Sequence, residues 1–158
     1  MEVIDFNYGA DRAPYLVMEL LEGEDLAARI RRHGRLDVRE AASVMRQVAS
    51  ALQAAHEKGI IHRDLKPQNI FLRRRGERDD FVKVVDFGIS KLLGAKSVVT
   101  RTNALMGTPA YVSPEQAEEK AAQVDRRTDV YALGVILFEM LTGQLPFSAE
   151  SVVMRASE

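Results

Sequence analysis

The sequence predicts an α+β fold in which a few short strands accompany two long helices. The first observation is a pair of strand-like runs at 3–8 and 15–20, separated by a segment with turn chemistry. The second is a series of apolar residues at helical spacing over 37–58. The third is a stretch at 129–142 that is apolar nearly all round, as a buried helix would be.

The two N-terminal runs are expected to form a β-hairpin. Two strands alone are only marginally stable in water, so this pair requires a larger sheet, which the chain does not supply. Gly23 breaks the second run. The following residues, 25–32, are predicted to form a short helix that ends at Gly34.

The clearest helix spans 37–58. Asp37 followed by Glu40 resembles a capping box at its start, and Gly59 stands where a left-handed residue commonly ends a helix. The apolar residues at helical spacing are Val38, Ala41, Ala42, Met45, Val48, Ala49, Leu52 and Ala55.

Two further short strands are expected at 70–72 and 81–85, joined by a solvated loop of mixed charge at 73–80. Three consecutive arginines in that loop could bind nucleic acid, but acidic residues follow them at once, so a surface loop is preferred. Residues 89–113 lack periodicity, and a long irregular segment in a compact domain is usually functional or mobile. The stretch 129–142 is predicted to be a central buried helix.

Composition narrows the classes of protein to consider. With 158 residues, 46% apolar and 28% charged, the chain resembles one soluble globular domain. A net charge of −1 gives no indication of nucleic-acid or membrane binding. The absence of cysteine excludes disulfides and cysteine nucleophiles and fits a cytoplasmic location. The scattered histidines predict no zinc site, and we expect no signal peptide and no membrane segment in this chain.

One run of residues carries the chemistry. It is His62-Arg63-Asp64-Leu65-Lys66-Pro67-Gln68-Asn69, followed later by Asp86-Phe87-Gly88. Asp64 can accept a hydrogen bond from a substrate hydroxyl, and Lys66 can neutralise charge on a transferring phosphate. Asn69 and Asp86 offer the sparse oxygen ligands that magnesium prefers when phosphate and water complete its shell.

Each part of this set also has a simpler interpretation. Asp-Phe-Gly alone is usually an ordinary turn, and His-Arg-Asp alone is unremarkable. His62 is better interpreted as a packing and hydrogen-bonding residue than as a base, and Phe87 as a core anchor. The complete set, in this order and bracketing a strand hairpin, is not credible as chance.

These motifs resemble the catalytic loop and the metal loop of protein kinases. Residues 107–115 resemble the kinase substrate-docking segment, with Ser113 where alanine is commoner, and Thr108 would face the substrate. Residues 129–135 resemble the start of the central kinase helix, which implies that Asp129 holds the backbone of the turn at His62–Asp64. Lys66 and Thr108 imply serine/threonine rather than tyrosine specificity.

The same resemblance implies an ATP site. Residues 15–23 resemble the last N-lobe strand and the hinge, with Met18 as gatekeeper and the backbone of Glu19 and Leu21 facing adenine. Asp25 falls where an acidic residue often meets the ribose. Phe71 would form the floor under adenine, although it could simply be a buried strand residue. The remaining predicted ATP contacts are Lys66, Gln68, Asn69 and Asp86, with magnesium on Asn69 and Asp86.

A regulatory role is expected for the loop before Thr108. Gln68, the Ser-Pro-Glu-Gln segment and the pair Thr100 and Thr102 resemble bacterial, Hanks-type serine/threonine kinases. The guanidinium of Arg63 could pair with a phosphothreonine, which carries three acceptor oxygens. The alternative is that both threonines are solvated loop residues.

The resemblance covers essentially the whole chain and implies a protein-kinase-like fold. It implies mainly the helical C-lobe, with the last two N-lobe strands and the hinge. We expect 1–22 to be an N-lobe remnant with the hinge, and 23–158 a C-lobe that lacks its last helices. No glycine-rich loop or strand lysine precedes the catalytic motif. The expected activity of the intact domain is transfer of the ATP γ-phosphoryl group to Ser or Thr of proteins. The alternative is a non-catalytic remnant that acts as an interaction module.

Overall fold

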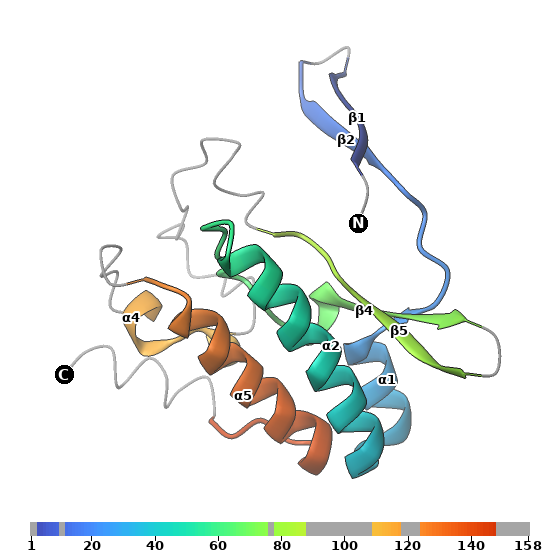
Figure 1. Cartoon of the computed structure of the whole chain (residues 1–158), viewed down its shortest axis with the longest axis vertical. Coiled ribbons are helices and arrows are strands. Elements are labelled where there is room, and N and C mark those ends of the chain that lie inside the picture. Colours follow the sequence, from blue (N-terminus) through green and yellow to red (C-terminus); the bar gives the residue numbers. More distant parts are fainter. Residues whose placement is uncertain (1–2, 10–11, 76–77, 88–108, 118–123, 148–158) are drawn as a thin grey trace.

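The computed structural model describes residues 3–9, 12–75, 78–87, 109–117 and 124–147 (Figure 1). It confirms the predicted combination of strands and helices. In chain order the elements are β1 Val3–Tyr8, β2 Pro14–Met18, β3 Glu24–Asp25, α1 Leu26–His33, α2 Val38–His56, η1 Pro67–Asn69, β4 Ile70–Arg75, β5 Arg78–Val84, η2 Pro109–Tyr111, α4 Pro114–Ala117 and α5 Arg127–Thr142.

The N-terminal hairpin forms as predicted, with β1 antiparallel to β2. It stands apart from the helical body at the top of Figure 1. Every residue of β1 is exposed, including Ile4 and Phe6, and the second strand ends at Met18 rather than at 20. The hairpin thus presents apolar side chains to solvent, as expected of a strand pair without a larger sheet.

Both predicted helix starts are confirmed, with the side chain of the preceding aspartate as the cap. Asp25 accepts a hydrogen bond of 2.7 Å from the amide of Ala28, and Asp37 accepts one of 2.8 Å from the amide of Arg39. Such caps satisfy amides that have no partner within the helix. Gly59 has the left-handed φ of 72° expected after α2.

The second sheet has the strand order β3–β4–β5, and it corrects one prediction. Most of the expected loop 73–80 is strand, because β4 reaches Arg75 and β5 begins at Arg78. The register pairs Arg73 with Phe81 and Arg75 with Arg78. Hydrogen bonds between strands do not depend on side-chain polarity, so charged residues extend a hairpin once pairing has begun.

The core joins α2 and α5, which run side by side in Figure 1, with α1 and the strands β4 and β5. Fully or almost fully buried residues on the facing sides include Val48 and Leu52 of α2 and Ile136 and Met140 of α5. The prediction that α5 is buried nearly all round is wrong, because Val130 and Phe138 are 61% and 43% exposed. Part of the apolar surface of α5 is therefore exposed in the described part of the chain.

The end of α5 is fastened to the end of α1. The amide of Leu36 donates to the carbonyl of Met140 at 2.7 Å, and Gly143 adopts φ 72° directly against the backbone of Gly34. In the described part of the chain, no helix has the length and the apolar character needed to cross a membrane. Of the predicted irregular stretch 89–113, residues 89–108 lie outside the described residues, and 109–111 form η2.

Candidate active site

The predicted catalytic residues lie together between α2 and β4, in residues 62–69, which we call the catalytic turn. The ammonium of Lys66 donates to a carboxylate oxygen of Asp64 at 2.8 Å. The carboxamide nitrogen of Asn69 donates to the backbone carbonyl of Asp64 at 2.8 Å, and Asn69 is buried. Side chains of the turn therefore hold it together by hydrogen bonds. The Asp64 carboxylate is 66% exposed, so a substrate could reach it.

The two predicted metal ligands lie on neighbouring segments of the chain, with Asn69 in η1 and Asp86 after the end of β5. The amide of Val85 donates to the carbonyl of Asn69 at 2.9 Å, which places Asp86 one residue beyond the point of contact. Asp86 is exposed and has a left-handed φ of 61°, uncommon for a residue other than glycine. Because the carboxamide nitrogen of Asn69 is already used, its oxygen is the atom left to ligate a metal.

This donor set fits magnesium bound with a nucleotide. Within the described ranges, no group of three or more His, Asp or Glu side chains could enclose a metal. Magnesium commonly takes one or two protein oxygens and completes its shell with phosphate and water. Asn69 and Asp86 would hold the ion, and it would supply positive charge to the phosphates.

Asp129 holds the catalytic turn, as the resemblance implied. Its side chain is fully buried at the start of α5 and accepts from the amides of His62 and Arg63, both at 2.9 Å. Arg63 has a left-handed φ of 68°. A non-glycine residue in this region costs of order 1–3 kcal/mol and persists only where the surroundings enforce it. The carboxylate of Asp129 is one part of that enforcement.

His62 packs and forms a hydrogen bond, in agreement with the simpler interpretation of this residue. Its ring is fully buried and lies 4.7 Å, between centroids, from the ring of Phe87. Nε2 lies 2.9 Å from the carbonyl of Val85 and must donate to it, since a carbonyl only accepts. His62 therefore ties the catalytic turn to the strand end that carries Asp86.

Two residues that sequence reasoning missed also hold this turn. His56, in the last turn of α2, places Nε2 2.7 Å from a carboxylate oxygen of Asp129. Gln116, in α4, donates from Nε2 to the carbonyl of Arg63 at 2.7 Å. The partners are 73 and 53 positions apart in sequence, so no spacing rule could have linked them.

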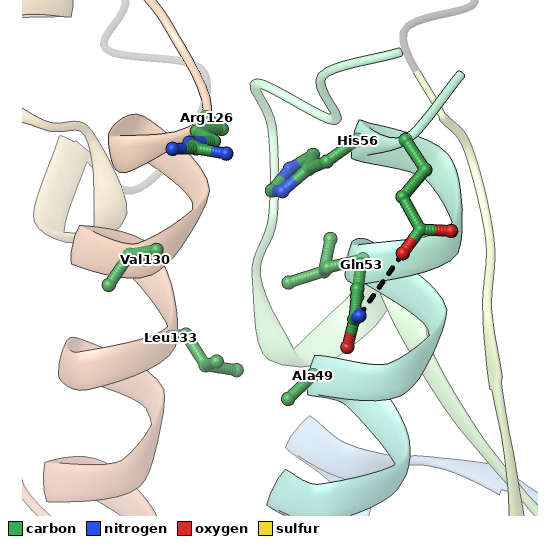
Figure 2. Close-up of a pocket in the computed structure, with 8 residues that line it drawn as sticks. Ala49, Gln53, His56, Arg126, Val130 and Leu133 are labelled. Carbon is green, nitrogen blue, oxygen red and sulfur yellow. Dashed lines mark hydrogen bonds between the residues drawn. The ribbon is translucent and has the colours of Figure 1, made fainter. Parts of the chain in front are cut away.

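A groove of about 320 Å³ lies between α2 and α5 beside His56 (Figure 2). Figure 2 shows Ala49, Gln53 and His56 on one wall and Arg126, Val130 and Leu133 on the other. The groove is distinct from the catalytic turn, and no residue predicted to bind ATP or magnesium lines it.

The sheet β3–β4–β5 brings several residues that are predicted to contact ATP close together. Phe71 of β4 is paired in register with Asp25 on one side and with Lys83 on the other. Lys83 in turn forms an ion pair with Glu19. Phe71 is half-buried, and β3 packs against η1, next to the catalytic turn. These contacts bring the predicted hinge, ribose and floor positions into one region.

The other residues predicted to contact the nucleotide differ in their exposure. Met18 is partly exposed at the end of β2, Leu21 is half-buried, and Gln68 is exposed in η1. The carboxylate of Asp25 caps α1, so the structure gives it a structural role beside the predicted ribose contact.

The predicted docking segment is fastened to α5. The hydroxyl of Tyr111 donates to Glu139 at 2.6 Å, and burial together with this carboxylate raises the pKa of the phenol well above its ordinary value. The hydroxyl of Thr128 donates to Glu115 at 2.7 Å. Burial alone would raise the pKa of Glu115, but this bond and further hydrogen bonds outweigh burial and lower it.

Three predicted positions cannot be placed. Thr100, Thr102 and Thr108 lie outside the described residues. The pairing of Arg63 with a phosphothreonine therefore stays a prediction.

Comparison with known proteins assigns this arrangement to a family. The family described as protein kinase domain matches residues 2–157. The serine/threonine-protein kinase pkn3 of Myxococcus xanthus is 44% identical over 156 residues, covering 97% of this chain and 28% of the relative. Pkn1 of the same organism is 50% identical over 139 residues, covering 88% of this chain and 20% of the relative. PrkC of Bacillus subtilis is 43% identical with the same coverage.

The structural comparison agrees. The crystal structure of Rad53 1–466 in complex with AMP-PNP superimposes with a TM-score of 0.71 at 31% identity, over 92% of this chain and 34% of that one. The chain spans only 20–28% of the length of the three curated relatives named above.

Proposed function

Because the chain belongs to the protein kinase family, we propose that it carries the catalytic and metal loops of a serine/threonine kinase of the bacterial type. The reaction is transfer of the γ-phosphoryl group of ATP to a Ser or Thr hydroxyl of a protein. In this proposal Asp64 orients the hydroxyl, Lys66 neutralises phosphate charge, and Asn69 and Asp86 hold magnesium.

The observation that carries the proposal is the set of hydrogen bonds within the catalytic turn. The contacts of Lys66 and Asn69 with Asp64 place three chemically different groups within one short segment. Phosphoryl transfer requires mainly alignment and charge compensation, and a turn held by its own hydrogen bonds favours both. We also propose that the protein acts in the cytoplasm, where its substrate ATP is made.

A chimera tests this function directly. In it, this chain replaces the matching segment of the M. xanthus kinase pkn3, so that the relative supplies the rest of the protein. We expect magnesium-dependent phosphorylation of Ser or Thr in a generic protein substrate, at about 1–100 s⁻¹ as for protein kinases in general. The intact relative is the positive control, and the chimera with Asp64→Ala is the negative control.

The isolated 158-residue chain is expected to show little or no turnover, because its sequence contains no glycine-rich loop to grip the phosphates. The rival proposal, a non-catalytic interaction module, predicts an inactive chimera. A folded chimera that binds magnesium-ATP but transfers no phosphate would favour that rival.

A further inference from the structure

Arg63 is the one non-glycine residue of the catalytic turn with a left-handed backbone conformation. Side chains of other elements form hydrogen bonds with both its amide and its carbonyl. Its amide donates to Asp129 at 2.9 Å. Its carbonyl accepts a bond of 2.7 Å from the carboxamide of Gln116. Asp129 belongs to α5 and Gln116 to α4, so two separate elements impose a conformation that the local chain disfavours.

Gln116 uses both ends of its carboxamide. Oε1 accepts from the amide and from the hydroxyl of Ser113, each at 3.2 Å, while Nε2 donates to Arg63. A flipped carboxamide would set its NH₂ against the Ser113 amide and its oxygen against the Arg63 carbonyl. Both contacts would be repulsive, so the hydrogen bonds fix the orientation of this side chain.

We propose that Gln116 is a positioning residue for phosphoryl transfer. It holds the carbonyl of Arg63, and through that residue it sets the direction of the neighbouring Asp64 carboxylate. The same side chain binds Ser113, so it also fastens the substrate-docking segment to the catalytic turn. This inference rests on the proposed function and assigns Gln116 no contact with substrate, nucleotide or metal.

The chemistry requires a carboxamide at this place. A carboxylate of the same shape can still accept from Ser113, but when ionised it cannot donate to Arg63 and instead repels its carbonyl. Methionine fills a similar volume and offers neither function. The two substitutions therefore separate the hydrogen bond from the packing of the side chain.

The test compares Gln116→Glu, Gln116→Met and the exposed control Gln144→Glu in the chimera. For Gln116→Met we expect kcat to fall about tenfold at every pH, as for loss of one hydrogen bond to a backbone group, with the KM for ATP unchanged. For Gln116→Glu we expect a similar or larger loss at about pH 8 that recovers, relative to the unmodified chimera, toward about pH 5, because the facing carbonyl of Arg63 and partial burial should raise the pKa of the new carboxyl above its ordinary value of about 4.3. Recovery occurs because the protonated carboxyl can again donate to Arg63. Gln144→Glu should match the unmodified chimera throughout.

A second measurement does not depend on catalysis. In the otherwise unmodified chimera, hydrogen exchange of the amides at 62–66 should be slower than in an unstructured peptide. Gln116→Met should accelerate that exchange, and Gln144→Glu should not. An inactive chimera with these exchange results would overturn the proposed function and leave the hydrogen-bonding role of Gln116 supported.

Other outcomes would overturn the inference itself. One is unchanged kcat in Gln116→Met within an active chimera, and another is a loss in Gln116→Glu that does not respond to pH. Exchange at 62–66 that is as fast as in an unstructured peptide would also reject it.

Discussion

Asp64 and Asp86 are two exposed carboxylates whose surroundings predict different roles. Asp64 is paired with Lys66 on the catalytic turn, whereas Asp86 follows the strand end that is bonded to Asn69. In the chimera, Asp64→Ala should abolish transfer and leave binding of magnesium-ATP largely intact. Asp86→Ala should weaken that binding as well, because it removes the main metal carboxylate.

A titration with ATP, with and without magnesium, separates the two effects when combined with initial rates. Asp125→Ala is a suitable control, since Asp125 is a surface residue paired with Arg127. Weakened nucleotide binding in Asp64→Ala together with normal binding in Asp86→Ala would refute the assignment.

At the residue scale, the sequence predicted groups that lie close in the chain and missed those that meet only in space. The closeness of Asp64, Lys66 and Asn69 was predictable because they are separated by short spacings in the chain. The anchoring role of Asp129 followed from resemblance. His56 and Gln116 carry no such signal, since an isolated His or Gln has the same local pattern whether or not it reaches the catalytic turn.

At the element scale, local sequence signals predicted the bounds of α2 better than the lengths of the strands. The caps and apolar spacing that start α2 are properties of the helix itself, so its bounds were predicted to within two residues. The length of β4 and β5 depends on pairing between them, and the charges of 73–80 concealed it. The apolar pattern of α5 was read correctly, but the pattern does not specify which faces are covered.

The contact between the ends of α1 and α5 gives a prediction with a matched control. Gly143 and Gly59 share a φ of 72°, but a Cβ on Gly143 would lie 2.2 Å from the carbonyl oxygen of Gly34, whereas one on Gly59 meets nothing within 4 Å. Gly59→Ala should cost about 1–2 kcal/mol from the left-handed backbone alone. Gly143→Ala should cost clearly more, because backbone must also move.

Thermal melting of the two variants in the chimera provides the measurement. Gly143→Ala should lower the midpoint by more than Gly59→Ala does. Equal shifts would show that the α1–α5 contact yields without cost, and would remove the close packing as the reason for glycine at 143.

The segment that contains Thr100 and Thr102, outside the described residues, remains the predicted regulatory element. A phosphothreonine adds a charge of about −1.5 to −2, which the guanidinium of Arg63 could pair with. After incubation of the chimera with ATP, mass spectrometry should find phosphate on one or both threonines. The double variant Thr100→Ala/Thr102→Ala should be less active. Unmodified threonines and a fully active double variant would contradict the assignment.

At the scale of the whole molecule, the described residues include exposed apolar side chains on the N-terminal hairpin and on α5, beside scattered ones such as Leu20 and Val38. The hairpin β1–β2 exposes Ile4 and Phe6, and α5 exposes Val130, on the wall of the groove toward α2, and Phe138. Contiguous exposed apolar residues usually mark a surface that another segment or molecule covers. Because the core that includes α2 and α5 is formed, we expect the chain to fold around it. The exposed apolar residues of the hairpin and of α5 would remain available for association with other molecules.

The isolated 158-residue chain is therefore expected to be poorly stable and to associate through those surfaces. Size-exclusion chromatography with light scattering should show oligomers or aggregates, and calorimetry should show a broad, irreversible transition. Replacing Ile4 and Val130 by lysine should reduce association, because both side chains are exposed and neither contributes to the buried core. Leu52→Lys is the opposite control, since Leu52 is buried and a charge there should prevent folding. A monomer that melts sharply, reversibly and in two states would contradict the expectation and show that the exposed apolar surfaces leave the isolated fold stable.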